Sequence, residues 1–159
     1  NGFYLVISLA FANAAGRAAA GFLSDRYGRL KILSATAAVQ GINMLAFAFY
    51  DTPVLLAAGA ALTGFCYGAP IALFPAATAD FFGVKHLGGN YGLLTTAWGI
   101  AGLAGPLLAG WAADVSGTYV TAYLFSAALL TAAAALGAGV KPPPAAPESV
   151  NIGEGRRGA

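Results

Sequence analysis

The chain has 159 residues, of which 58% are hydrophobic and 9% are charged, whereas about 25% are charged in an ordinary soluble domain. This composition excludes most soluble folds and predicts an integral membrane protein. The net charge of +2 without a basic face argues against nucleic acid as a partner, and the single cysteine, Cys66, excludes an internal disulfide.

Five apolar segments follow one another along the chain, and each is near the roughly 20 residues that a helix needs to cross a hydrocarbon core. They cover residues 2–22, 32–50, 54–77, 91–112 and 119–139. The connections between them are short, and Pro53 suits the first turn of the third helix. We therefore expect an all-α membrane protein in which residues 1–140 form a transmembrane bundle with the lipid bilayer as its partner.

The loop charges predict an orientation, because lysine and arginine favour the cytoplasmic side of a membrane. Seven of the eight cations fall on one side of the expected topology: Arg26, Arg29, Lys31, Lys85, Lys141, Arg156 and Arg157. This distribution predicts a multi-pass protein of the cell membrane with a cytoplasmic C-terminus. Residues 141–159 are rich in Pro and Gly, without an apolar period, and are expected to form a disordered cytoplasmic tail.

The eighth cation, Arg17, lies inside the first predicted helix. If Asp25 marks the membrane surface, Arg17 lies about 12 Å deeper, near the middle of the bilayer. An arginine there costs about 2.5–3.5 kcal/mol on insertion scales and normally faces a protein interior or a watery cavity. Asn13 and Gly21 share its row at four-residue spacing. We expect this row to face a cavity, although Arg17 could also snorkel or pair with another helix for stability.

Two predicted helices carry small residues at every fourth position, which indicates close helix contacts, since lipid cannot drive helices together by hydrophobicity. The first row is Ser8, Ala12, Gly16, Ala20 and Ser24, and the second is Ala97, Ala101, Gly105, Ala109 and Ala113. Interruptions by Pro70, Pro75 and Pro106 are typical of transporter helices that line a cavity. Gln40 and Asn43 are expected to bridge helices rather than to contact a ligand.

The charged stretch at residues 21–31 reads GFLSDRYGRLK and resembles the G-x-L-x-D-R-x-G-R-x-K/R pattern of the major facilitator superfamily. Glycine at 28 permits a tight turn, and Asp25 can accept hydrogen bonds from a helix N-terminus or pair with Arg29. The alternative is a positively charged turn at the membrane surface. In the family this loop stabilises one access state, so the resemblance implies a gating role for Gly21, Asp25, Arg26, Gly28 and Arg29.

Three further segments resemble one particular branch of this superfamily. The segments FPAATADFFG at 74–83, NYG at 90–92 and AWGIAG at 97–102 are similar to the oxalate/formate antiporter-like branch, close to the monocarboxylate transporters. The resemblance covers nearly all of residues 1–140 and implies helices 8–12 of a twelve-helix major facilitator fold. The chain is then expected to be a C-terminal fragment whose missing partner is the N-terminal half of the same carrier, together with the seventh helix.

In that branch an arginine of the eighth helix binds the substrate carboxylate, and Arg17 occupies the matching position. A guanidinium suits a carboxylate because it offers parallel donors. Oxalate exchangers carry a lysine where this chain has Trp98, which favours a monocarboxylate, and proton-coupled relatives carry an aspartate where it has Asn13. Trp98 and Tyr67 are expected to shape the site with Asn13, although both aromatic residues could serve ordinary packing.

The predicted function is a secondary active transporter of small organic anions, with monocarboxylates favoured, working by alternating access. Two alternatives stay open: a carrier of another solute, such as a drug or sugar, and a non-transporting membrane sensor or interaction protein with the same fold. The sequence contains no candidate nucleophile set, carboxylate pair, metal-ligand spacing or phosphate-binding loop. We therefore expect no enzyme activity, cofactor or metal.

Overall fold

The computed structural model describes residues 2–141, with side chains from residue 6 onward, so the expected tail beyond Lys141 lies outside the described residues. The described part consists of five long α-helices and one short 3-10 turn. They are α1 (Gly2–Tyr27), α2 (Arg29–Phe47), α3 (Pro53–Phe82), η1 (Val84–His86), α4 (Leu87–Ser116) and α5 (Val120–Gly139). All five α-helices are long and apolar enough to cross a membrane, which confirms the predicted all-α architecture.

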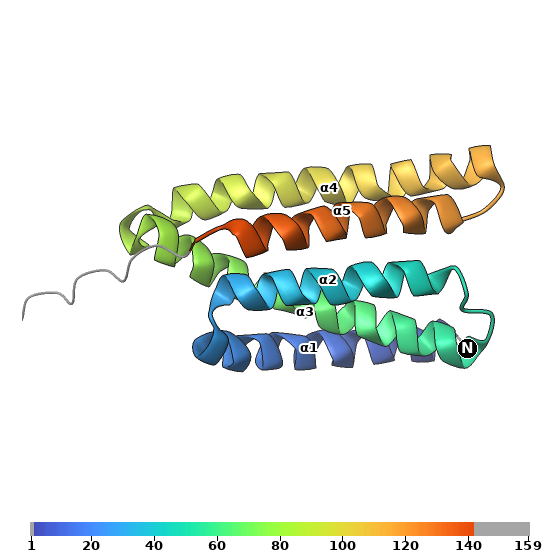
Figure 1. Cartoon of the computed structure of the whole chain (residues 1–159), viewed down its shortest axis with the longest axis horizontal. Helices are drawn as coiled ribbons and strands as arrows, with labels where there is room; N and C mark the ends of the chain where they lie inside the picture. Colours follow the sequence, from blue (N-terminus) through green and yellow to red (C-terminus); the bar gives the residue numbers. More distant parts are fainter. Residues whose placement is uncertain (1, 142–159) are drawn as a thin grey trace, which may run out of the picture.

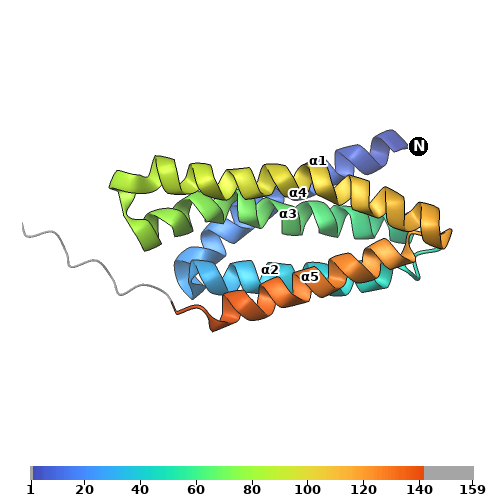
Figure 2. The same ribbon diagram turned by 90° about the horizontal axis from the view of Figure 1, so that it is seen from above.

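The helices form two groups that meet through α2 and α5. In Figure 1, α1, α2 and α3 lie together below, and α4 and α5 lie above them, while Figure 2 shows α4 on the side of α3 and α5 on the side of α2. The turned view in Figure 2 shows α5 running along α2, while α1 crosses the other helices at an angle. The α1–α2 and α3–α4 connections and the end of α5 lie at one end of the bundle, as expected for consecutive membrane crossings.

Three helix ends lie further along the chain than the apolar pattern predicts. α1 continues through Asp25 to Tyr27, so most of the charged stretch is helical, and the break falls at Gly28 with φ 93°. α3 continues to Phe82 and ends at Gly83 with φ 76°, while α4 continues to Ser116. Backbone hydrogen bonding does not stop at the membrane surface, whereas hydropathy does, so the apolar pattern underestimates helix length.

The prolines do not end the helices that contain them. Pro70 and Pro75 lie inside α3, and Pro106 lies inside α4. Pro53 occupies the first turn of α3, as predicted, and the Thr52 side chain caps this helix by accepting a hydrogen bond from the Leu55 amide at 3.3 Å.

The contact between α1 and α3 depends on glycines. A Cβ atom at Gly16 would overlap the carbonyl oxygen of Phe65, and one at Gly64 would overlap the carbonyl oxygen of Leu9. A Cβ atom at Gly68 would likewise overlap α1 backbone. Ala20 and Ser24, in the same row as Gly16, are 4% and 5% exposed. The predicted small-residue contact face of α1 is therefore confirmed, with α3 as its partner.

The equivalent row on α4 does not make the predicted contact within the described chain. No residue of α4 is buried, and no atom lies within 4 Å of a Cβ built at Gly105. Gly105 instead lines a hollow of about 450 Å³ between α4 and α5, together with Ala101 and Ala109. The contact of this row therefore stays a prediction, because four-residue spacing identifies a smooth face but not the helix that covers it.

A leucine at Gly16 tests the α1–α3 contact. We expect Gly16→Leu to destabilise the purified chain by about 1–3 kcal/mol or more, because the side chain would push two backbones apart. Thermal unfolding in detergent, followed by circular dichroism, measures the change. Gly105→Leu is the matched control, since open space surrounds that position. Equal melting temperatures for the two variants would show that the glycine contact does not stabilise the bundle.

Candidate functional site

Arg17 lies beside the α1–α3 contact. Its neighbour Gly16 is buried against Phe65, and the backbone nitrogen of Arg17 would lie 2.9 Å from a Cβ atom placed at Gly68. Its side chain is exposed. The five helices described here therefore hold the backbone of Arg17 tightly but do not enclose its guanidinium.

Asn13 connects Arg17 to α3. The Arg17 Nε donates a hydrogen bond to Asn13 Oδ1 at 3.0 Å, and Asn13 Nδ2 donates to the Gly64 carbonyl oxygen at 3.2 Å. Among the described residues, the terminal nitrogens of the guanidinium make no hydrogen bond. The four-residue spacing thus places the two side chains in one row, as predicted, and leaves two parallel donors unused.

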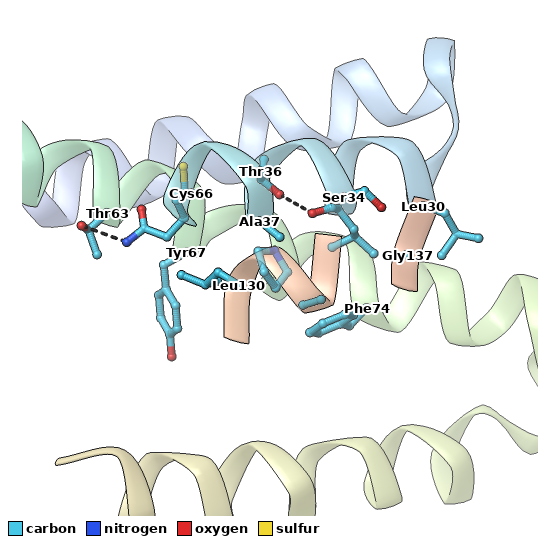
Figure 3. Close-up of a pocket in the computed structure, with 14 residues that line it drawn as sticks. Leu30, Ser34, Thr36, Ala37, Thr63, Cys66, Tyr67, Phe74, Leu130 and Gly137 are labelled. Carbon is cyan, nitrogen blue, oxygen red and sulfur yellow. Dashed lines mark hydrogen bonds between the residues drawn. The ribbon is translucent and has the colours of Figure 1, made fainter. Parts of the chain in front are cut away.

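Tyr67 and Trp98 form a second pair, between α3 and α4. Their ring centroids lie 5.7 Å apart with an interplanar angle of 50°, and they line an open hollow of about 470 Å³. Figure 3 shows Tyr67 pointing from α3 toward the α4 ribbon. Within residues 6–141, no hydrogen bond or ring contact joins this pair to Asn13 and Arg17. The two pairs are nevertheless close along α3, because Tyr67 lies between the Gly64 and Gly68 contacts.

A further cavity of about 400 Å³ lies between α2, α3 and α5 and was not predicted (Figure 3). Its wall is mostly apolar, with Leu33, Pro70 and Leu130 among the lining residues. The Ser34 hydroxyl also lines it and is buried without a hydrogen-bond partner in the described chain. Tyr67 borders both this cavity and the hollow beside Trp98.

A buried polar cluster joins α2 to α3. Asn43 is 2% exposed, and its Nδ2 donates to the Gly59 carbonyl oxygen and to Thr63 Oγ1, both at 3.1 Å. Gln40 Nε2 also donates to Thr63 Oγ1, at 3.2 Å, and the Tyr50 hydroxyl donates to Asn43 Oδ1 at 3.2 Å. The expected bridging role of Gln40 and Asn43 is confirmed, and their partners are residues that the sequence pattern did not single out.

The charged stretch is paired differently from the expectation. Arg29 Nε lies 3.1 Å from Asp80 Oδ2, near the end of α3, rather than beside Asp25. Asp25 and Arg29 lie on separate helices across the Gly28 break, and Asp25 is exposed without an ion pair to any described residue. The glycine at 21 has no atom within 4 Å of a Cβ built there, so no described neighbour uses its small size.

Comparison with known proteins identifies transporters. The model of the Major Facilitator Superfamily matches residues 2–158. The MFS transporter asaE of Aspergillus flavus is 35% identical over 131 residues, which cover 80% of this chain and 29% of the relative. The oxalate:formate antiporter of Oxalobacter formigenes is 35% identical over 112 residues, which cover 67% of this chain and 26% of the relative. Human monocarboxylate transporter 14 is 42% identical over 64 residues, which cover 40% of this chain and 12% of the relative. The chain spans less than a third of each relative.

The Arg29–Asp80 ion pair can be measured by a double-mutant cycle with Arg29→Gln and Asp80→Asn. We expect a coupling energy of about 0.2–1 kcal/mol, because both side chains are partly exposed, at 31% and 46%. The readout is the unfolding free energy in detergent at low and high salt, and the coupling should shrink as salt rises. Asp25→Asn, combined with Arg29→Gln, is the control cycle. Stronger coupling in the control cycle would contradict the observed pairing.

Proposed function

Because the chain belongs to the Major Facilitator Superfamily, we propose that it is part of a secondary carrier of small organic anions, with monocarboxylates as the favoured class. Family membership makes it a multi-pass membrane protein of the transporter class rather than an enzyme. The observation that carries the proposal is the guanidinium of Arg17, held at Nε and with both terminal nitrogens free of described partners.

The charges of the described helices favour an anion as the ligand of Arg17. The four described acids, Asp25, Asp51, Asp80 and Asp114, lie at helix ends or in a loop, so none lies mid-helix beside Arg17. A guanidinium at mid-helix depth in a membrane without an acid beside it is electrostatically incomplete, and a carboxylate supplies the missing charge through two parallel hydrogen bonds. The low dielectric of the membrane interior strengthens such a pair relative to water.

The number of cations favours a single carboxylate. The described spans offer one mid-helix cation, and the neighbouring aromatic pair, Tyr67 and Trp98, offers an apolar wall rather than a second charge. A monocarboxylate with a short apolar body would match this combination, whereas the second charge of a dicarboxylate would have no partner. Among the relatives, one is named for oxalate and formate and others for monocarboxylates.

The remaining part of the carrier is a required partner in this proposal. The chain spans 12–29% of the relatives described above, and the small-residue row of α4 has no covering helix within the described residues. In the proposal, further helices of the same carrier complete the wall around Arg17, and the two halves alternate in opening to each side. Measuring the mass of the natural protein tests this, since a protein of only this length would lack the second half.

The charged stretch has a gating role in the same proposal. Gly21, Asp25, Arg26, Gly28 and Arg29 would stabilise one access state, with Asp25 free to meet a helix of the other half. This end of the bundle also carries Lys85 and Lys141, which supports a cytoplasmic location for it and for the C-terminus in the cell membrane.

Arg17 is tested in the full-length carrier reconstituted into proteoliposomes. We expect Arg17→Gln to reduce affinity about 10- to 150-fold, because a charged hydrogen bond contributes about 1.5–3 kcal/mol. Arg17→Lys should be nearly as defective, since an ammonium cannot form the bidentate pair. Uptake of labelled formate, acetate and lactate is the measurement, and Lys85→Gln is the surface control. Unchanged uptake in both Arg17 variants would remove Arg17 from the mechanism, and transport of sugars or drugs alone would favour another solute class.

Trp98 is tested by the substrate preference of the same carrier. We expect Trp98→Lys to raise uptake of oxalate relative to acetate, because a second cation can pair with the second carboxylate. Trp98→Phe keeps an aromatic ring and should keep the natural preference. If the oxalate to acetate ratio is the same in all three proteins, Trp98 does not set the charge preference.

A further inference from the structure

We propose that Asn13 is a positioning residue: it holds Arg17 at Nε, and the two terminal guanidinium nitrogens are thereby kept for a carboxylate. This inference rests on the proposed anion-binding role of Arg17 and assigns Asn13 a different task from the expected one. The sequence suggested that Asn13 shapes the site directly, whereas in the structure both ends of its amide are already hydrogen-bonded.

The chemistry of the three groups determines the direction of each hydrogen bond. A guanidinium only donates, so the group facing Arg17 Nε must be the amide oxygen of Asn13. A carbonyl only accepts, so the group facing Gly64 must be the amide NH₂. The two contacts, at 3.0 Å and 3.2 Å, therefore require one and the same amide orientation. An alanine could make neither contact.

The engagement of Nε decides which edge of the guanidinium is open. A carboxylate can approach the edge formed by Nε and one terminal nitrogen, or the edge formed by the two terminal nitrogens. Asn13 occupies the first donor, which leaves the second edge for bidentate binding. Holding the side chain before the ligand arrives also reduces the conformational entropy lost on binding. Because the amide is neutral, the full positive charge of Arg17 remains available.

The glycines of α3 make this arrangement possible. Gly64 and Gly68 bring the α3 backbone against α1 next to Asn13 and Arg17, so that the short Asn13 side chain reaches a carbonyl of the neighbouring helix. The α3 backbone thus fixes the orientation of the Arg17 side chain through Asn13. Tyr67 lies on the same stretch of α3, so one helix positions both the guanidinium and the aromatic wall of the site.

The experiment compares two substitutions at Asn13 in the full-length carrier, using whichever of formate, acetate and lactate the unmodified protein transports fastest. We expect Asn13→Ala to raise KM about tenfold, while expression and maximal rate stay within about twofold and the melting temperature falls no more than in Asn43→Ala. A loss of positioning weakens ligand binding, whereas a loss of a structural bridge would lower stability instead. Asn43→Ala is the matched control, because Asn43 bridges α2 to α3 away from Arg17.

Asn13→Asp supplies a readout that a structural role would not produce. At neutral pH the new carboxylate should pair with Arg17 and compete with the substrate, so uptake should fall at least tenfold. Raising the anion concentration should restore uptake, because a carboxylate that competes for Arg17 raises KM and leaves the maximal rate within about twofold, whereas a purely structural defect would not be relieved by substrate.

The outcomes separate this inference from the proposed function. If Arg17→Gln abolishes uptake but Asn13→Ala leaves KM unchanged, Asn13 does not position Arg17 and the anion proposal stands. If Asn13→Ala lowers stability without a KM effect, as expected for Asn43→Ala, its role is structural and the inference fails. The inference also fails if Asn13→Asp leaves KM unchanged. Retained uptake in the Arg17 variants would overturn the proposed function first.

Discussion

The backbone contact between α1 and α3 is the constraint on which the arrangement of this protein depends. Three glycines, Gly16, Gly64 and Gly68, stand where a Cβ atom would overlap the backbone of the opposite helix. Lipid tails are as apolar as leucine, so burying large apolar side chains does not drive helices together in a bilayer. Close packing must come from smooth faces, and the buried apolar side chains here are accordingly mostly alanines. This contact also decides where the Arg17 backbone lies.

Polar contacts between helices complement the glycine contact at different depths. Asn13 reaches Gly64 between α1 and α3, Asn43 reaches Gly59 between α2 and α3, and Arg29 pairs with Asp80 at the end of the bundle. Each involves α3, which is therefore the central helix of the first group. An interhelical hydrogen bond within the membrane contributes about 0.6–2 kcal/mol, whereas the partly exposed Arg29–Asp80 pair contributes about 0.2–1 kcal/mol. They also set the relative rotation of helices whose apolar surfaces look alike.

Similar rows of small residues on α1 and α4 have different surroundings in the structure. Both helices carry small residues at four-residue spacing, but α3 covers the row of α1, while the row of α4 lines a hollow beside α5. Tyr67 borders two hollows, one between α2, α3 and α5 and one beside Trp98 of α4. The substrate-handling surface proposed here is therefore one wall of a site, which agrees with the short span that the chain covers in its relatives.

The sequence by itself determined the membrane class, the five spans, the small-residue face of α1 and the row that places Asn13 beside Arg17, because hydropathy and helical periodicity are local properties. The tertiary structure decided which helix covers each face. It paired Arg29 with Asp80 instead of Asp25, joined Asn43 to Thr63, and tied Asn13 to the Gly64 carbonyl. These partners are remote along the chain, and only packing of the helices specifies their distance, so spacing within one helix cannot reveal them.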